Sequence, residues 1–194
     1  GKAQGTMTTW YTSGQKRMET PFADDERHGM ETIYYEEGPK RMERCYTRGK
    51  LEGKAKSWFA SGEKQFEVTY KNGKQDGVAV FWFESGKKQA EISYTADKLD
   101  GPSVGWYANG VKKGVIPFVD NKKDGVETSW YENGKKEYER PYREDKLHGL
   151  ATTWYRSGAK MAETPFRDGD KDGVETGWYE NGKKEYELPF KAGV

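Results

Sequence analysis

Few residues of this sequence are of the types that carry catalysis. The chain has two histidines, His28 and His148, and a single cysteine, Cys45. Both histidines precede a glycine, at a position where similar segments of the chain carry Asp or Glu. An imidazole or thiol acts in catalysis when a base, nucleophile or carboxylate is held beside it, and no spacing here provides one. We therefore interpret the histidines as turn residues and expect Cys45 to have no nucleophilic role.

One segment imitates a metal site. Asp168, Asp170 and Asp172 alternate in a stretch that resembles the start of an EF-hand calcium loop, but Tyr179 stands where the loop needs its glutamate. Turn chemistry explains the segment better. The sequence also lacks a phosphate-binding loop, a dinucleotide fingerprint and zinc-ligand spacing. We predict a protein that is not an enzyme, with no catalytic residues, no metal site and no cofactor.

The charge balance limits the partners. The chain has 33 basic and 32 acidic residues, for a net charge of +1, so we expect no nucleic-acid partner. No apolar run approaches the roughly 20 residues that span a bilayer, and we expect no membrane insertion. A single cysteine allows no internal disulfide. The chain opens on Gly1, so its native start is expected to lie elsewhere, and we expect a cytoplasmic location.

A glycine recurs every 24 residues without insertion, which indicates a repeat protein. A second glycine follows nine residues after the first in each unit, preceded by Ser, Asn or Glu. We predict one repeat array over residues 1–194, with residues 1–4 as the tail of a preceding unit. The eight units start at Gly5, Gly29, Gly53, Gly77, Gly101, Gly125, Gly149 and Gly173.

The aromatic residues follow the same period. With 7 Trp, 13 Tyr and 8 Phe against few aliphatics, aromatic side chains must supply the burial. The Trp column is Trp10, Tyr34, Trp58, Trp82, Trp106, Trp130, Trp154 and Trp178. The second aromatic column directly follows it, from Tyr11 to Tyr179, and the third is Phe22, Tyr46, Tyr70, Tyr94, Phe118, Tyr142, Phe166 and Phe190.

Each unit reads as one β-hairpin. Asn-Gly or Ser-Gly between two short runs is a strong hairpin signal, because a two-residue type I′ turn needs positive φ at both positions. If Asn133 and Gly134 are that turn, Tyr131 lies opposite Lys136, Trp130 opposite Glu137, and Ser129 opposite Tyr138. The last pair matches large residues with small ones across the units, as in Gly177 with Tyr186.

The expected fold is all-β: an elongated single-layer antiparallel meander of eight 24-residue hairpins, with about 16 strands and six-residue connections such as 143–148. Three aromatics per unit cannot offset the entropy of ordering 24 residues. Neighbouring hairpins must therefore stabilise one another. A proline column near the end of the second strand, which includes Pro141, is expected to bend the sheet there.

The pattern Gly-x-x-x-x-Trp-Tyr-x-x-Gly-x-Lys, as in Gly125 to Lys136, resembles the MORN-repeat variant family over the whole chain. The resemblance implies a MORN-like β-hairpin array without enzymatic chemistry. It also implies a bacterial antitoxin or immunity protein of a toxin–antitoxin pair, which binds its partner protein. The adjacent Trp-Tyr pair departs from the eukaryotic MORN unit, so lipid binding associated with that branch transfers poorly.

Two charged columns accompany the rings. Lysine fills all eight equivalents of Lys136, and we expect its stem to lie over a ring of the second aromatic column; a basic stripe for a polyanion is the alternative. Glutamate fills seven of eight places of the other column, with Val115 as the exception. A variable column runs Arg17, Arg41, Gln65, Gln89, Lys113, Glu137, Met161 and Glu185.

Strand alternation predicts that Trp, Glu and the variable column share one face. Trp side chains among polar groups suit a protein-binding surface, although each Trp can instead simply cover the neighbouring strands. The predicted partner-binding residues are Trp10, Trp58, Trp82, Trp106, Trp130, Trp154, Trp178, Glu67, Glu91, Glu139, Glu163, Gln89 and Glu137.

The sequence thus predicts a non-catalytic protein-binding repeat protein, with a cognate toxin as the partner that the resemblance implies. Two other functions stay open. Evenly spaced tryptophans also suit carbohydrate or cell-surface binding, and a repeat array can serve as a structural scaffold. The oligomeric state is not determined by these patterns.

Overall fold

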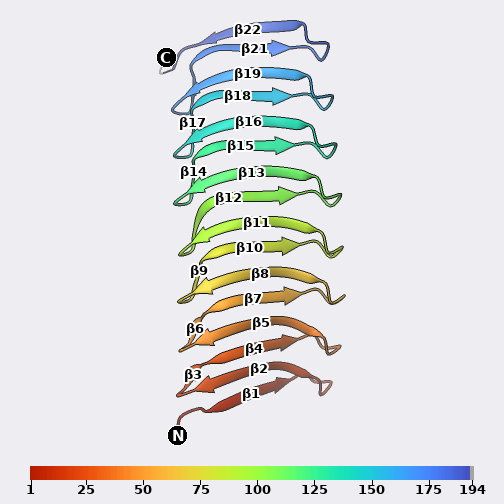
Figure 1. Ribbon diagram of the computed structural model, residues 1–194, viewed down its shortest axis with the longest axis vertical. Helices are drawn as coiled ribbons and strands as arrows, with labels where there is room; N and C mark the ends of the chain where they lie inside the picture. Colours follow the sequence, from red (N-terminus) through yellow and green to blue (C-terminus); the bar gives the residue numbers. More distant parts are fainter. Residues whose placement is uncertain (193–194) are drawn as a thin grey trace. The chain divides into compact units, whose positions relative to one another are not determined.

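The computed structural model describes residues 1–192, which form an all-β protein of 22 strands joined by turns (Figure 1). The pairings between these strands are antiparallel, and each joins two strands that are consecutive or two places apart in the chain. These residues contain no helix long and apolar enough to cross a bilayer. The predicted all-β hairpin meander is confirmed.

Each repeat contributes two long strands. The first strands of the hairpins are β1 (Gly5–Trp10), β4 (Gly29–Tyr34), β7 (Gly53–Trp58), β10 (Gly77–Trp82), β12 (Lys98–Trp106), β15 (Gly125–Trp130), β18 (Gly149–Trp154) and β21 (Gly173–Trp178). The second strands are β2 (Lys16–Ala23), β5 (Lys40–Thr47), β8 (Lys64–Lys71), β11 (Lys88–Thr95), β13 (Lys112–Val119), β16 (Lys136–Arg143), β19 (Lys160–Arg167) and β22 (Lys184–Phe190).

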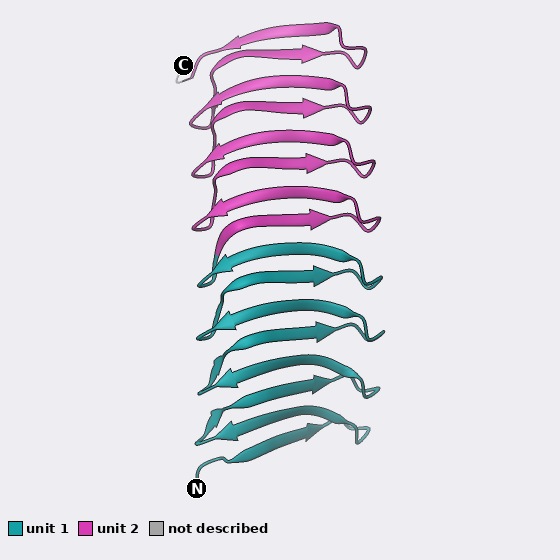
Figure 2. Cartoon of the chain, viewed as in Figure 1, with its two compact units in different colours: residues 1–98 teal, residues 99–194 magenta. Residues whose placement is uncertain are grey.

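Six two-residue strands complete the set. They are β3 (Glu26–Arg27), β6 (Lys50–Leu51), β9 (Lys74–Gln75), β14 (Lys122–Lys123), β17 (Lys146–Leu147) and β20 (Asp170–Lys171). The chain divides into two compact units, Gly1–Lys98 and Leu99–Val194, which hold four hairpins each (Figure 2).

All eight hairpins share one register. The glycine that opens each repeat pairs with the third aromatic column, as Gly125 does with Tyr142, and Ser129 pairs with Tyr138. The predicted match of large and small residues is confirmed at Gly177, where an added Cβ would lie 2.2 Å from the Tyr186 ring. With the Tyr186 ring in this position, any side chain at Gly177 would overlap it.

The predicted type I′ turn at the hairpin tip is wrong. Gly134 N–H donates to the Tyr131 carbonyl (3.0 Å or less in every repeat), Tyr131 N–H donates to Lys135, and only Gly134 has a positive φ, of 83°. This is a type I turn closed by a left-handed glycine. Because the turn holds one residue more than expected, the register shifts at a bulge and Trp130 pairs with Lys136. The predicted pairs Tyr131 with Lys136 and Trp130 with Glu137 do not form.

The Asn133 side chain stabilises this turn, and the backbone of Asn133 does not adopt a left-handed conformation. The Asn133 Oδ1 accepts the Lys135 N–H at 3.1 Å, and its Nδ2 donates to the Arg156 carbonyl of the next tip at 2.8 Å. The side chain thus closes its own loop as an Asx turn and connects two tips.

The connections between hairpins are not six-residue loops. In 143–148, Arg143 pairs with Lys146 and Tyr142 with Leu147. Glu144 and Asp145 have φ values of 46° and 68°, so they form the two-residue left-handed turn that had been expected at the tip. The chain then bends at Gly149 (φ 112°), where an added Cβ would lie 3.1 Å from the Pro141 ring.

These connecting turns form a hydrogen-bonded ladder along the repeats. The Asp145 N–H donates to the Lys123 carbonyl at 2.9 Å, and the Asp145 Oδ1 accepts the Lys123 N–H at 2.7 Å. Where glycine replaces the Asp, as at Gly169, only the backbone bond remains. Direct pairing between consecutive hairpins is short by comparison, since β16 and β18 join through only two residue pairs, Tyr138 with Thr153 and Glu139 with Thr152.

The second aromatic column supplies a further link between hairpins. The Tyr131 hydroxyl donates to the Trp154 carbonyl at 2.8 Å, 23 residues on. The same bond, at 2.8 to 2.9 Å, is made by Tyr11, Tyr35, Tyr107 and Tyr155. In the first unit Phe59 occupies this column and has no hydroxyl to donate.

Three carboxylates lie in the core, which the sequence did not indicate. Glu31, Glu127 and Glu175 are 0%, 6% and 9% exposed and occupy the column that Ala55, Ala79 and Ala151 fill elsewhere. Glu31 pairs with Arg44 and accepts a hydrogen bond from Thr20. Each carboxylate has cationic or hydroxyl partners, which is the condition for burying a charge.

The Glu127 site shows the balance of forces. Burial disfavours its charge, but the Lys123 ammonium at 2.7 Å and the Tyr138 hydroxyl at 2.8 Å outweigh burial and lower the pKa of Glu127 from 4.5. Burial and the bond to Glu127 raise the pKa of Tyr138 to about 12. Tyr138 therefore keeps its proton at neutral pH and donates to the carboxylate.

We expect stability to fall when the tyrosine hydroxyl is removed from one hairpin and to rise when a hydroxyl is added to another. Tyr131→Phe should lower the free energy of unfolding by about 1 kcal/mol, because the Trp154 carbonyl loses a donor. Phe59→Tyr should raise it by about 0.5 to 1 kcal/mol by supplying that donor to Trp82. Urea denaturation measures both changes. Equal destabilisation by the two substitutions would show that the hydroxyl does not couple the hairpins.

Stability should depend on pH through Glu127. Its folded pKa is lowered, so its contribution is fully present above about pH 4.5 and is lost as the pH falls through the folded pKa. Glu127→Gln should be about 1 to 3 kcal/mol less stable than wild type at pH 7, with the gap narrowing below pH ~4. The control is Glu139→Gln, which breaks an exposed ion pair and should cost less than about 0.5 kcal/mol. If urea titrations give the same difference in free energy of unfolding between wild type and Glu127→Gln at every pH, Glu127 is not the source of the pH dependence.

Candidate functional site

Alternation along the strands gives the sheet two chemically different faces. We call the face with Val126, Thr128, Trp130, Lys136 and Glu139 the Trp face. The other, which carries the buried carboxylates and the column of Tyr138, is the Tyr face. The surfaces available to a partner are therefore considered one face at a time.

Lysines of the Trp face contact tryptophans, not the second aromatic column. The Lys136 Nζ lies 2.5 Å from Glu139 in its own strand and 5.5 Å from the ring centroid of Trp154 in the next hairpin. The bulge causes this difference, because it moves each lysine one place toward the Trp column. Ion pairs of this kind join Lys16–Glu19, Lys40–Glu43, Lys64–Glu67, Lys88–Glu91, Lys136–Glu139, Lys160–Glu163 and Lys184–Glu187.

The tryptophans are half-buried as a result. The Trp130 ring has the Lys112 ammonium 5.6 Å from its centroid, whereas Trp10, which has no such lysine, is 59% exposed. The predicted sharing of one face by Trp and Glu is consistent with the register, in which Glu139 pairs with Thr128. Since the glutamates neutralise seven of the eight lysines, the Trp face does not form a continuous basic stripe.

An apolar row runs beside these ion pairs. Residues directly after the opening glycine are 49% to 52% exposed in five hairpins. Prolines pair with three of them across the hairpin. The row consists of Val126, Leu150 and Val174 on three consecutive hairpins of the second unit, and Met30 and Val78 occupy the equivalent positions in the first unit. Exposed apolar side chains in regular succession are typical of an interaction surface.

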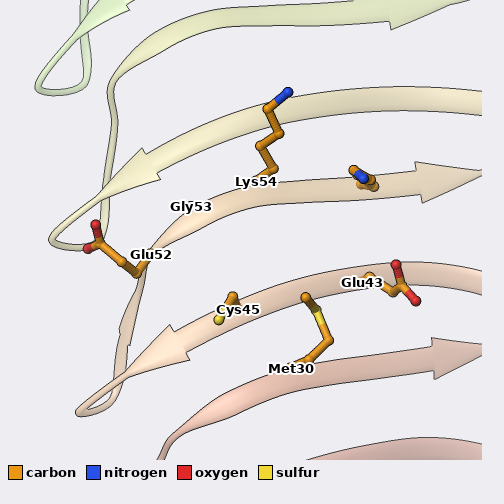
Figure 3. Close-up of a pocket in the computed structure, with 7 residues that line it drawn as sticks. Met30, Glu43, Cys45, Glu52, Gly53 and Lys54 are labelled. Atoms are coloured by element: carbon orange, nitrogen blue, oxygen red, sulfur yellow. The ribbon is translucent and has the colours of Figure 1, made fainter.

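The first unit has a hollow of about 430 Å³ on the same face (Figure 3). Met30 and Cys45 line it, with Lys54 and Glu43 nearby, and Gly53 lies at its border. Cys45 occupies the proline column. Where proline is present, its ring lies 2.8 to 3.1 Å from the Cβ position of the next glycine, but nothing lies within 4 Å of that position at Gly53. The missing ring opens the hollow.

The variable column lies on the Tyr face, which corrects the predicted placement. The Gln65 Oε1 accepts a hydrogen bond from Ser57, and Glu137 accepts one from Ser129, both at 2.7 Å. Gln89 lines a hollow together with Phe66 and Phe81. The bulge is again the cause, because it removes this column from the position opposite Trp.

Two hollows follow the variable column in the first unit. One, of about 540 Å³, lies between the first two hairpins and includes Tyr11, Arg17 and Arg41. The other, of about 510 Å³, lies between the third and fourth hairpins and includes Phe59, Gln65 and Gln89. The Phe66 and Phe81 rings form its floor, with centroids 6.2 Å apart.

The structure therefore separates the predicted partner-binding residues. The seven tryptophans and Glu67, Glu91, Glu139 and Glu163 lie on the Trp face, while Gln89 and Glu137 lie on the Tyr face. Sequence reasoning missed the half-exposed apolar row and the two hollows. The row had a signal, since an apolar residue follows the opening glycine in most units.

The other residues considered for catalysis or metal binding take part in turns. The His148 Nδ1 lies 3.3 Å from Asp168 and faces the next connecting turn. In the calcium-like segment, Asp168 and Gly169 form a left-handed turn, and Asp172 pairs with Arg167 at 2.7 Å. Within residues 1–192, no three His, Cys, Asp or Glu side chains are grouped to hold a metal ion.

Comparison with known families agrees with this geometry. Residues 51–72, 75–96, 123–144 and 171–192 match a family model. The model that these segments match is that of the MORN repeat variant. Each of the four segments begins two residues before the opening glycine of a hairpin and spans both long strands. Together they cover a little under half of the chain.

The other four hairpins have the same register as the four matched hairpins. Gly149 pairs with Phe166 as Gly125 does with Tyr142, and both hairpins have the bulge before Trp. The structural repeat thus extends beyond the matched segments. No curated protein matches this chain.

We expect Cys45→Pro to stabilise the protein. Five hairpins already have proline at this position, and its ring would fill the hollow beside Gly53. The gain should be about 0.4 to 1 kcal/mol, because proline restricts the unfolded chain. Urea denaturation checks it, with Cys45→Ser as a control that leaves the hollow open. Destabilisation by proline alone would mean that the backbone at Cys45 differs from that of the other repeats.

Proposed function

We propose that this chain is a non-catalytic repeat protein that binds a protein partner on its Trp face. The observation that supports this proposal is the apolar row of Val126, Leu150 and Val174 in the second unit, each about half exposed, with Met30 and Val78 equally exposed at the equivalent positions of the first unit. Apolar side chains framed by polar and charged groups are the usual composition of a protein interface. The Lys–Glu pairs beside the row supply such a frame.

The Trp column serves both stability and binding in this proposal. The rings are covered on one side by lysines, as Trp130 is by Lys112, and remain partly exposed on the other. Rigid aromatic rings add contact area at a small entropy cost. The same lysines weigh against carbohydrate binding, because a sugar that stacks on Trp needs the ring surface that the ammonium already covers.

The partner that we propose is a cognate toxin, with the chain acting as an antitoxin or immunity protein. This finer part rests on the family resemblance of the repeat, and the repeats themselves support only a binding role. Side chains of the types that act in catalytic centres take part in turn contacts instead, as His148 does with Asp168. A row of binding positions along successive hairpins suits a partner with an extended surface.

The test uses, as the candidate toxin, the protein encoded by the gene that neighbours the gene of this chain. We expect Val126→Ser and Leu150→Ser each to weaken binding at least about tenfold, a change of 1.4 kcal/mol. Melting temperatures should stay close to wild type, because exposed positions contribute within about 0.5 kcal/mol. Isothermal titration calorimetry and thermal melting measure the two effects.

The matched control is Leu188→Ser, at 48% exposure on the Tyr face. It should leave affinity unchanged. If wild type binds but none of the three variants weakens it, the Trp face is not the interface. If wild type neither binds nor neutralises the candidate toxin, the antitoxin role is wrong.

A further inference from the structure

The hollow between the first two hairpins combines cationic and apolar walls. It holds about 540 Å³ and is lined by Thr9, Tyr11, Arg17, Met18, Ile33 and Arg41. Its size falls within the usual range of ligand sites, about 300 to 1,000 Å³. It lies on the Tyr face, away from the apolar row described above.

Both arginines are held over fixed rings. The Arg17 guanidinium carbon lies 5.9 Å from the Tyr11 ring centroid, and that of Arg41 lies 5.8 Å from the Tyr35 centroid. The two rings cannot turn freely, since each hydroxyl donates to a backbone carbonyl at 2.8 Å. A guanidinium within cation–π distance of a ring keeps its N–H edge available for carboxylate or phosphate. The two donors are therefore preorganised.

Neither arginine has an acidic partner in the part of the chain that the structure describes. By contrast, Arg27 and Arg44 both approach Glu31, and Arg167 pairs with Asp172. The lysines next to the two arginines in sequence pair with glutamates on the other face. Arg17 and Arg41 thus stand as two uncompensated cations beside Met18 and Ile33.

The equivalent hollow two hairpins later provides an internal comparison. Gln65 and Gln89 replace the arginines there, and Gln65 is satisfied by Ser57. Its lining is mainly aromatic, and its one charged residue is the acidic Glu84. The cationic character therefore belongs to the first two hairpins and does not follow from the repeat itself.

We propose that this hollow binds an acidic polypeptide segment through Arg17 and Arg41, with an apolar side chain of the segment on Met18 and Ile33. Equivalent positions of neighbouring hairpins lie two strands apart, or about 9.6 Å. An extended polyproline II segment brings residues i and i+3 to the same side about 9.3 Å apart. Two carboxylates three residues apart match the two guanidiniums.

The apolar floor favours a polypeptide over a simple anion. A phosphate ion would pair with the guanidiniums but leave Met18 and Ile33 uncovered. The net charge of +1 provides no broad attraction for nucleic acid. An acidic segment with one apolar side chain can contact both the cationic and the apolar walls of the hollow.

The experiment measures fluorescence anisotropy of a labelled, proline-rich octapeptide with glutamates three residues apart and a leucine between them. Wild type should bind it at low ionic strength. The double variant Arg17→Gln/Arg41→Gln should weaken binding at least about tenfold, since each arginine makes a charge-assisted contact. The control double variant, Arg143→Gln/Arg156→Gln, removes the same charge from exposed positions and should bind like wild type.

Two further arms identify the ligand class. A peptide with glutamine in place of glutamate should not bind, and inorganic phosphate should compete only weakly. The proposal is overturned if wild type fails to bind the acidic peptide, if both double variants behave alike, or if phosphate competes as well as the peptide does. Matching melting curves for all variants exclude unfolding. A toxin-like partner that binds the Trp face regardless of these variants would leave the proposed function intact.

Discussion

Hydrogen bonds between neighbouring hairpins are the interaction on which this structure depends. Direct strand pairing between consecutive hairpins spans two residue pairs, as in β16 with β18, which is too little to hold an isolated hairpin in place. Three repeated devices supply the rest: the backbone ladder of the connecting turns, the tyrosine hydroxyl on the next Trp carbonyl, and the proline ring on the next glycine. Each acts only between neighbours, so stability accumulates hairpin by hairpin.

This arrangement assigns different duties to the two faces. The Tyr face buries carboxylates and rings and so carries most of the packing. The Trp face combines ion pairs, half-covered tryptophans and an exposed apolar row, and seven of its eight column lysines are paired with glutamates. Surface ion pairs of this kind add little stability. They do hold long side chains in place beside the apolar row, which reduces the entropy that binding would have to remove.

The period and its columns could be read from the sequence, because residues at one position of every hairpin meet the same surroundings. The turn type at the hairpin tip could not be determined in the same way. Asn133-Gly134 suits either a two-residue turn or a type I turn with a left-handed glycine. A signal was available, since Glu37 occupies the same place and tolerates positive φ poorly. The two-residue turns were instead marked by Asn72-Gly73 and Asp168-Gly169.

That single choice of turn decided which side-chain contacts could be predicted. Placing one extra residue in the tip moves the variable column onto the Tyr face and brings lysines such as Lys136 and Lys160 close to the tryptophan of the next hairpin. The binding surface was therefore misassigned although the strands were correct. The buried carboxylates had no comparable signal. Glu127 alternates with alanine in its column, and its burial depends on Lys123 and Tyr138, which a reading of one strand does not bring together.

The contacts that stabilise this chain are repeated in most hairpins. A site that recognises one specific partner must therefore be formed by positions at which the hairpins differ. Two hollows of the first unit lie where a coupling group is absent: Cys45 stands in place of a proline, and Phe59 lacks the tyrosine hydroxyl. Loss of a link leaves space that the neighbours do not fill, because the backbone ladder on either side keeps the hairpins at their fixed spacing. A repeat of this kind can therefore gain a binding site by losing one interaction, at a stability cost confined to a single junction.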